Sequence, residues 1–247
     1  MPLPAAVCFL LGPLLGPLLG VLVDRSVERE TPEPFLRCPQ CSQRLPVPFP
    51  VPIVSWFARC PDGHRSWRYP VTDLGAGVLF AIAGWTFGWS WQLLPYLIFF
   101  AMLAVMSVVD IEHKLLLDIF TFPTLFFGLF VVLALSGPND FEVGIAPALW
   151  AGGLYFVFFF LANRIYPPGM GLGDVKLAPS LGLFLGWLAD DSFRGVQITM
   201  TAILVALLSG AVIGMIAQRS RKAEVPFGPF MVLGAVVMIA ITNPAGV

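Results

Sequence analysis

Two aspartates, Asp110 and Asp174, are the residues of this chain whose types and positions best suit chemistry. Asp174 follows a glycine-rich stretch at 169–173, and Asp110 follows the uncharged run 74–109. An ionisable side chain at the edge of such apolar sequence is costly and by default marks a function. Two carboxyls a few ångströms apart share a proton, so one can act as base on a water while the other donates to a carbonyl. The pair predicts hydrolysis of a peptide bond at a membrane surface.

The composition indicates a membrane protein. The 247 residues are 57% hydrophobic and 12% charged, with a mean hydropathy of +0.84, whereas a soluble domain carries about a quarter charged residues. We therefore expect an all-α integral membrane protein in contact with the lipid bilayer. The net charge of −1 and the lack of a long basic run indicate no nucleic-acid partner. The first apolar run lacks a charged n-region and a cleavage motif, so we expect a retained span.

The apolar runs predict about eight transmembrane helices. Residues 74–109 would reach about 54 Å as one helix, which exceeds the roughly 30 Å hydrocarbon core, so they must fold back. The turn is expected at Trp89–Gln92, because tryptophan favours the membrane interface. The predicted spans are residues 4–23, two within 74–109, 119–136, 143–162, 173–189, 195–217 and 226–243.

One polar segment is long enough to form a domain outside the membrane. Residues 24–73 are rich in Arg and Pro and contain three of the four cysteines. We expect a first helix at 1–23, a small cytoplasmic loop domain at 24–73 and a seven-helix membrane domain at 74–247.

The distribution of Lys and Arg predicts the orientation. The loops between the predicted spans are numbered from the N-terminus. Thirteen of the 14 Lys and Arg residues fall in odd-numbered loops, and only Arg194 falls in an even-numbered loop. Because basic residues accumulate in cytoplasmic loops, we expect the Cys-containing loop inside the cell and both termini outside. Asp110 then ends the third span and Asp174 begins the sixth, at similar depth on the cytoplasmic side.

The same topology excludes the other acids as partners of Asp174. Asp140, Asp190 and Asp191 would lie on the far face of the membrane. Asp118 would begin span four, nearer to water. Glu112 would lie about 200° around its helix from Asp110. Asp110 is therefore the expected partner.

Four stretches of the chain, in order, carry a resemblance that covers nearly its whole length. They are Pro52–Trp56 with Arg68-Tyr69-Pro70, Val109–Asp118 with Pro123, Gly169–Leu177 continuing to Leu185-Gly186-Trp187, and Val225-Pro226-Phe227-Gly228-Pro229-Phe230. The sequence resembles the type IV prepilin leader peptidases, a family of membrane aspartic peptidases with a Gly-x-Gly-Asp signature. The resemblance implies cleavage of the basic leader of prepilins or pseudopilins at the cytoplasmic face of the bacterial inner membrane.

The resemblance also implies roles for individual residues. Asp110 and Asp174 would be the catalytic pair, and Gly171 and Gly173 would let a substrate backbone approach it. Lys176 would bias the charge state of the pair or orient the glycine loop; alternatively it is an interfacial lysine that extends its ammonium group to water. Many bacterial members also methylate the new N-terminus with S-adenosylmethionine, and that activity rests here on resemblance alone.

Two positions depart from the family pattern. Pro179 is unusual after Lys176 and is expected to kink or delay the sixth span. Asp73 stands where many relatives have glutamate.

The cysteines of the polar loop form a further departure. Many relatives carry two C-x-x-C pairs there, a spacing suited to tetrahedral zinc. Cys38 and Cys41 keep the first pair, but the second reads Cys60-Pro61-Asp62-Gly63-His64, with glycine in place of the fourth cysteine. We expect His64 to complete a structural zinc site with Cys38, Cys41 and Cys60. The alternative is a degenerate site with free thiols.

Two other classes of function fit part of the pattern. A multi-pass transporter would use Asp110 and Asp174 as ion ligands or proton relays, although both lie near one interface and not at the midplane. A non-catalytic subunit of a pilus or secretion machine would keep the fold without turnover.

Overall fold

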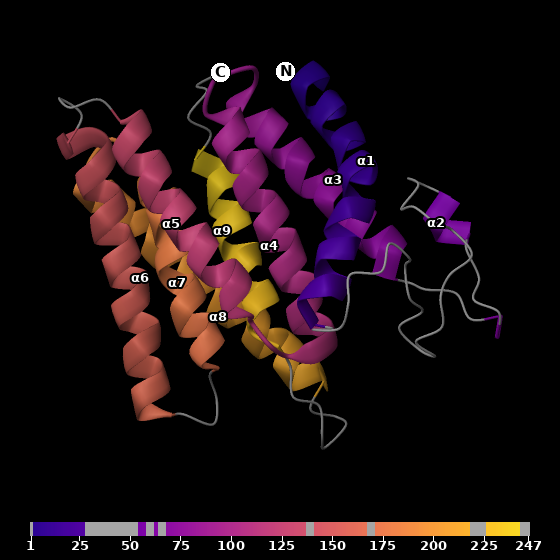
Figure 1. Ribbon diagram of the computed structural model, residues 1–247. Helices are drawn as coiled ribbons and strands as arrows, with labels where there is room; N and C mark the ends of the chain where they lie inside the picture. Colours follow the sequence, from indigo (N-terminus) through magenta and orange to yellow (C-terminus); the bar gives the residue numbers. More distant parts are fainter. Residues whose placement is uncertain are drawn as a thin grey trace. The chain divides into compact units, whose positions relative to one another are not determined.

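The computed structural model describes residues 2–27, 54–57, 62–63, 68–136, 141–166, 171–217 and 226–242. The regular elements of these residues are helices (Figure 1). They are α1 Pro2–Val27, α2 Val54–Phe57, α3 Arg68–Phe87, α4 Leu93–His113, α5 Asp118–Leu135, the π-helix η1 Phe141–Ile145, α6 Ala146–Ile165, α7 Leu172–Gly186, α8 Ser192–Ala217 and α9 Gly228–Thr242. The chain forms two compact units, residues 1–108 and 109–247, so the unit boundary falls within α4.

The predicted all-α membrane fold is confirmed. In the described part of the chain, eight helices are longer than α2 and η1, and each matches a predicted span. Six of them are long and apolar enough to cross a membrane, and α9 is a shorter apolar helix. Helix α7 has 15 residues, about 22 Å at 1.5 Å per residue. The chain is thus a multi-pass membrane protein.

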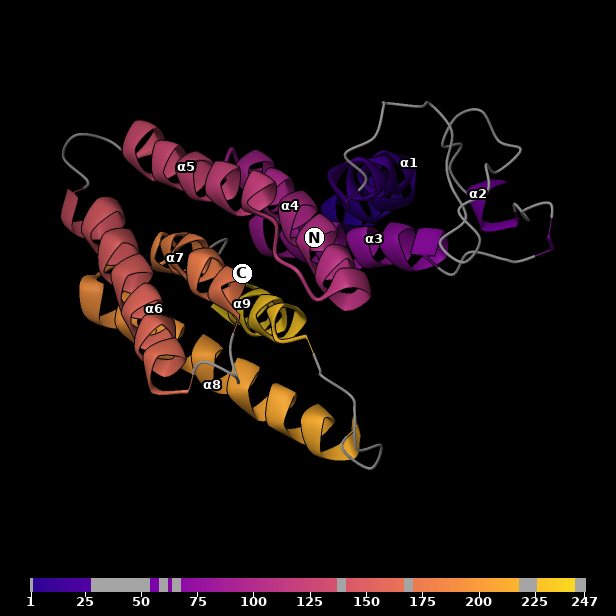
Figure 2. The ribbon, with the colours of Figure 1, turned by 60° about the horizontal axis from the view of Figure 1, so that its bottom comes forward.

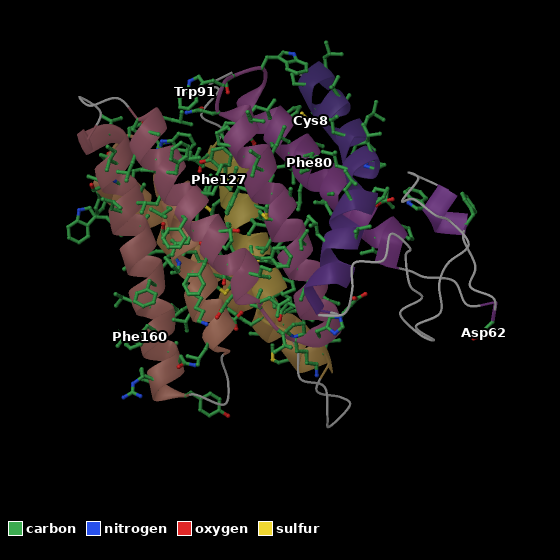
Figure 3. All side chains as sticks on the ribbon, in the orientation of Figure 1. Cys8, Asp62, Phe80, Trp91, Phe127 and Phe160 are labelled. Atoms are coloured by element: carbon green, nitrogen blue, oxygen red, sulfur yellow. The ribbon has the colours of Figure 1, made fainter. Side chains whose placement is uncertain are left out.

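The predicted fold-back within residues 74–109 is also confirmed. Helix α3 ends at Phe87, and α4 begins at Leu93 after a turn in which Gly88 has a φ of +57°. The Trp91 side chain in this turn is exposed (Figure 3). A positive φ suits glycine, which lacks a Cβ atom.

In unit 1, α1 and α3 pack closely through glycines. A Cβ atom on Gly12 would overlap the Cα atom of Gly77, and one on Gly84 would lie 2.7 Å from the carbonyl oxygen of Pro4. Small residues let helix backbones approach in lipid. Cys8 and Phe80 are both buried in this unit (Figure 3), so Cys8 is the buried, free thiol expected for an apolar run.

Unit 1 also contains a buried carboxylate. The indole Nε1 of Trp56, in the short helix α2, donates to Oδ2 of Asp73 in α3 at 2.6 Å. Asp73 is fully buried. This bond fastens α2 to α3, and α3 begins at Arg68, within the segment assigned to the loop domain.

In unit 2, α7 is the central helix. It contacts α5, α6, α8 and α9 (Figure 2), and nearly all of its side chains from Asp174 to Gly186 are buried. A helix that is apolar on all sides is expected inside a bundle. The helices α5 and α7 start at the same end of the unit, because Lys176 reaches Asp118, and end together, because Trp187 Nε1 donates to Ser136 Oγ at 3.1 Å.

Small residues let α6 pack closely on α7. Cβ atoms on Gly182 and Gly186 would overlap the carbonyl oxygens of Ala151 and Pro147 in α6. Phe127 of α5, labelled in Figure 3, packs against Phe184 of α7 with ring centroids 6.2 Å apart. The predicted delay at Pro179 is wrong: α7 begins at Leu172 and continues through Pro179 to Gly186.

We predict that Gly12→Ala destabilises unit 1 by about 1–3 kcal/mol, the usual cost of overpacking. The matched control is Gly75→Ala in α3, where an added Cβ meets nothing within 4 Å and helix propensity favours alanine. Thermal unfolding of the detergent-purified protein, followed by tryptophan fluorescence, measures both. Equal midpoints for the two variants would contradict the close packing of α1 on α3.

Candidate active site

Asp110 lies in the last turn of α4, and the local backbone explains why the helix ends there. Lys114 has a φ of +53°, and its N–H donates to the carbonyl oxygen of Asp110 at 2.8 Å. A residue in the left-handed region with this bond is a common helix C-terminus. The chain then runs through residues 115–117 into α5, which begins at Asp118.

The carboxyl of Asp110 is buried, with 5% of the residue exposed. Its Oδ2 atom accepts a hydrogen bond from the backbone N–H of Gly228 at 3.0 Å. Gly228 is the first residue of α9, and the first N–H groups of a helix have no partner within it. A carboxylate at the C-terminus of its own helix is disfavoured, but the N-terminus of α9 offsets this.

Asp174 is held in the same way by another helix start. It is the third residue of α7, with 6% exposed. Its carboxyl accepts a hydrogen bond from the backbone N–H of Gly171, the N-cap of α7. An acid at this position that reaches back to the N-cap N–H completes one half of a capping box.

The structure brings the two predicted aspartates together. Their carboxyls lie close enough to interact electrostatically. Leu116 packs against the glycine beside each of them: a Cβ on Gly173 would lie 2.6 Å from Leu116 Cβ, and one on Gly228 would lie 3.4 Å from Leu116 Cδ1. One leucine side chain therefore separates and supports the two helix starts that hold the carboxyls.

Phe227 fixes the start of α9. Its ring centroid lies 5.8 Å from that of Phe159 in α6, and a Cβ on Gly210 in α8 would lie 3.0 Å from its ring. This packing holds the N–H of Gly228 next to Asp110.

Lys176 does not point at the aspartate pair. Its Nζ atom donates to both oxygens of Asp118 at 2.6 and 2.8 Å and lies 5.6 Å from the ring centroid of Phe122. The ammonium group is thus paired with the first residue of α5. Of the two glycines expected to admit substrate, Gly171 is exposed and Gly173 packs on Leu116.

Of the acids that the topology excluded, Asp140 lies outside the described residues. Asp118 is exposed and paired with Lys176. Glu112 Oε2 lies 3.7 Å from His113 Nε2, and Asp190 follows the far end of α7, where Arg194 donates to it at 2.7 Å. Asp118 and Asp190 are thus paired with basic side chains, whereas Asp174 interacts with Asp110.

The predicted zinc ligands, Cys38, Cys41, Cys60 and His64, lie outside the described residues, as does Gly169. Among the described residues, no group of three or more His, Cys, Asp or Glu side chains could hold a metal ion.

Sequence reasoning missed the roles of Gly228 and Leu116. A signal existed for Gly228, because Pro226 and Pro229 frame it as a helix start. No such signal existed for Leu116, because the sequence does not distinguish it from other apolar residues in short loops. Together these residues support two buried carboxyls that can share a proton, which is the arrangement needed to activate a water and polarise a carbonyl.

Comparisons with known proteins show which family the chain resembles. The model of the type IV leader peptidase family matches residues 97–216, and that of the bacterial peptidase A24 N-terminal domain matches residues 10–87. The chain is similar to proteins named prepilin leader peptidase/N-methyltransferase. For the one from Stutzerimonas stutzeri, identity is 32% over 83% of this chain and 71% of the relative. The relative from Pseudomonas aeruginosa is 31% identical over 81% of this chain and 69% of its own length. The relative from Dickeya chrysanthemi is 33% identical over 85% of this chain and 74% of its own length. No solved structure matches.

We predict that Asp110→Asn and Asp174→Asn fold as stably as the parent, because an amide oxygen still accepts the glycine N–H. Asp110→Ala and Asp174→Ala leave these N–H groups without an acceptor and should each cost about 1 kcal/mol. Thermal unfolding in detergent measures all four. Asn variants that unfold as early as the Ala variants would contradict the hydrogen bonds described here.

Proposed function

Because this chain belongs to the type IV leader peptidase family, we propose that it is a membrane aspartic endopeptidase that removes the leader from type IV prepilins or pseudopilins. The proximity of two buried carboxyls, Asp110 and Asp174, carries this proposal. The names of its relatives support the choice of substrate. We place the protein in the bacterial inner membrane, with the pair and the loop at 24–73 on the cytoplasmic side.

Both aspartates would take part directly in hydrolysis. The ionised carboxylate removes a proton from a water molecule, whose oxygen attacks the scissile carbonyl carbon. The protonated carboxyl gives its proton to the carbonyl oxygen, which forms a neutral tetrahedral diol. Collapse of the diol breaks the C–N bond, and the amine leaves with a proton from the pair. The N–H groups of Gly171 and Gly228 orient the two carboxyls throughout.

The membrane fold suits the proposed substrate. A prepilin combines a short basic leader with an apolar helix, so its scissile bond lies where polar and apolar sequence meet. Asp110 lies in the last turn of a spanning helix, and Asp174 lies in the first turn of α7. The pair therefore lies at a helix end, where such a bond would be presented.

A second proposed activity is N-methylation, which the names of the relatives support. The new N-terminus as the methylated group and S-adenosylmethionine as the methyl donor rest on the family resemblance alone. Radiolabelled S-adenosylmethionine added to a cleavage reaction tests it. Label on the mature pilin would establish the transfer, and unlabelled mature pilin would exclude it.

We predict that Asp110→Asn and Asp174→Asn each lower prepilin cleavage by about 10²–10⁴-fold, the usual contribution of a general acid or base. The assay is a gel-shift of a prepilin in mixed detergent micelles. Asp190→Asn, an exposed acid at the far end of α7, is the matched control and should cleave normally. Cleavage at the parental rate by either Asp110→Asn or Asp174→Asn would rule out the pair, and ion transport without cleavage would favour a transporter.

The loop at 24–73 is proposed to bind one structural zinc through Cys38, Cys41, Cys60 and His64. Three thiolates and an imidazole form a donor set that suits tetrahedral Zn²⁺. We predict one zinc per chain in the purified protein and a large loss in His64→Ala, with Asp62→Ala as control. Elemental analysis measures the zinc content, and a parent protein without zinc would contradict the proposed site.

A further inference from the structure

We infer that Asp118 and Lys176 form a positioning pair for the active site, an inference that rests on the proposed function. Neither side chain reaches the two carboxyls. The pair acts through the helix starts to which these side chains belong, and it sets the separation of Asp110 from Asp174.

The geometry of α7 gives Lys176 this role. Lys176 is two residues after Asp174 in the same first turns, so the two side chains point about 200° apart around the helix. While Asp174 faces the partner carboxyl, Lys176 makes two short bonds to Asp118 and lies over the ring of Phe122. The start of α7 is thereby fastened to the start of α5.

The connection to Asp110 runs through Leu116. Asp118 is the first residue of α5, and Leu116 lies two residues before it, in the short segment that follows α4. Leu116 contacts Gly173 and Gly228, which adjoin the two aspartates. Any movement of Asp118 away from Lys176 would withdraw this leucine and loosen both helix starts.

The pair is too exposed to contribute much to folding. The exposed fractions of the Lys176 and Asp118 side chains are 39% and 55%, and such ion pairs add little to global stability. Catalysis is more demanding, because misplacing a reacting group by about 1 Å can cost about 100-fold in rate. Loss of the pair should therefore slow the reaction without unfolding the protein.

The test is a double-mutant cycle of Lys176→Met, Asp118→Asn and their combination, with prepilin cleavage as the assay. Methionine keeps the apolar stem over Phe122 and removes only the charge. We expect each single variant to lose about 10- to 100-fold in kcat with little change in KM, and the double variant to be no slower than either. Lys176→Arg should restore most of the rate, since a guanidinium pairs with a carboxylate through two bonds.

The pH–rate profile separates positioning from damage to the fold. Electrostatic coupling between two carboxyls weakens with distance, so the acid and alkaline limbs of the profile should approach each other in Lys176→Met. Misfolding would lower the rate and leave the limbs in place.

The matched control is the other exposed ion pair of unit 2 that the structure describes, Arg194 with Asp190 at 2.7 Å. Arg194→Met should leave the rate and the profile unchanged. The positioning pair would be overturned if Lys176→Met kept the parental kcat. It would also be overturned if the losses in the double-mutant cycle were additive, or if the limbs of the pH–rate profile did not move. If instead Asp110→Asn or Asp174→Asn cleaves normally, the proposed peptidase itself fails, whatever the cycle shows.

Discussion

Two buried carboxyls that interact electrostatically need hydrogen-bond donors, and the structure takes these donors from helix starts. The N–H groups of Gly171 and Gly228 are unpaired within their own helices and point at Asp174 and Asp110. The need for these donors constrains where the helices of unit 2 begin and how they pack. Helices α7 and α9 must both begin at the site, and α7 must run through the middle of α5, α6, α8 and α9 (Figure 2).

Several glycines of unit 2 remove bulk where backbones or side chains meet. Gly173 and Gly228 make room for Leu116, and Gly182 and Gly186 let α6 approach α7. A glycine-rich stretch beside a candidate catalytic residue is typical of a flexible loop that admits substrate. For Gly173, the contact with Leu116 gives a packing reason as well.

The sequence predicted the helices and the pairing of Asp110 with Asp174, because both follow from strong and separable signals. Long apolar runs define spans, and the segregation of Lys and Arg puts particular helix ends on one side. The partner of Lys176 and the role of Gly228 required three-dimensional contacts between segments far apart in the chain. The start of α7 is not delayed to Pro179, because α7 is held by neighbours on four sides and such packing outweighs the local cost of a proline.

The proposed chemistry requires the side chains of residues 110 and 174 to lie next to each other. Crosslinking of Asp110→Cys with Asp174→Cys by a short thiol-reactive reagent tests this proximity, in a chain whose four native cysteines are replaced. Gly152→Cys with Leu183→Cys, whose positions touch between α6 and α7, is the positive control. We expect mass spectrometry to find the 110–174 link as readily as the control link. A control link without a 110–174 link would contradict the account.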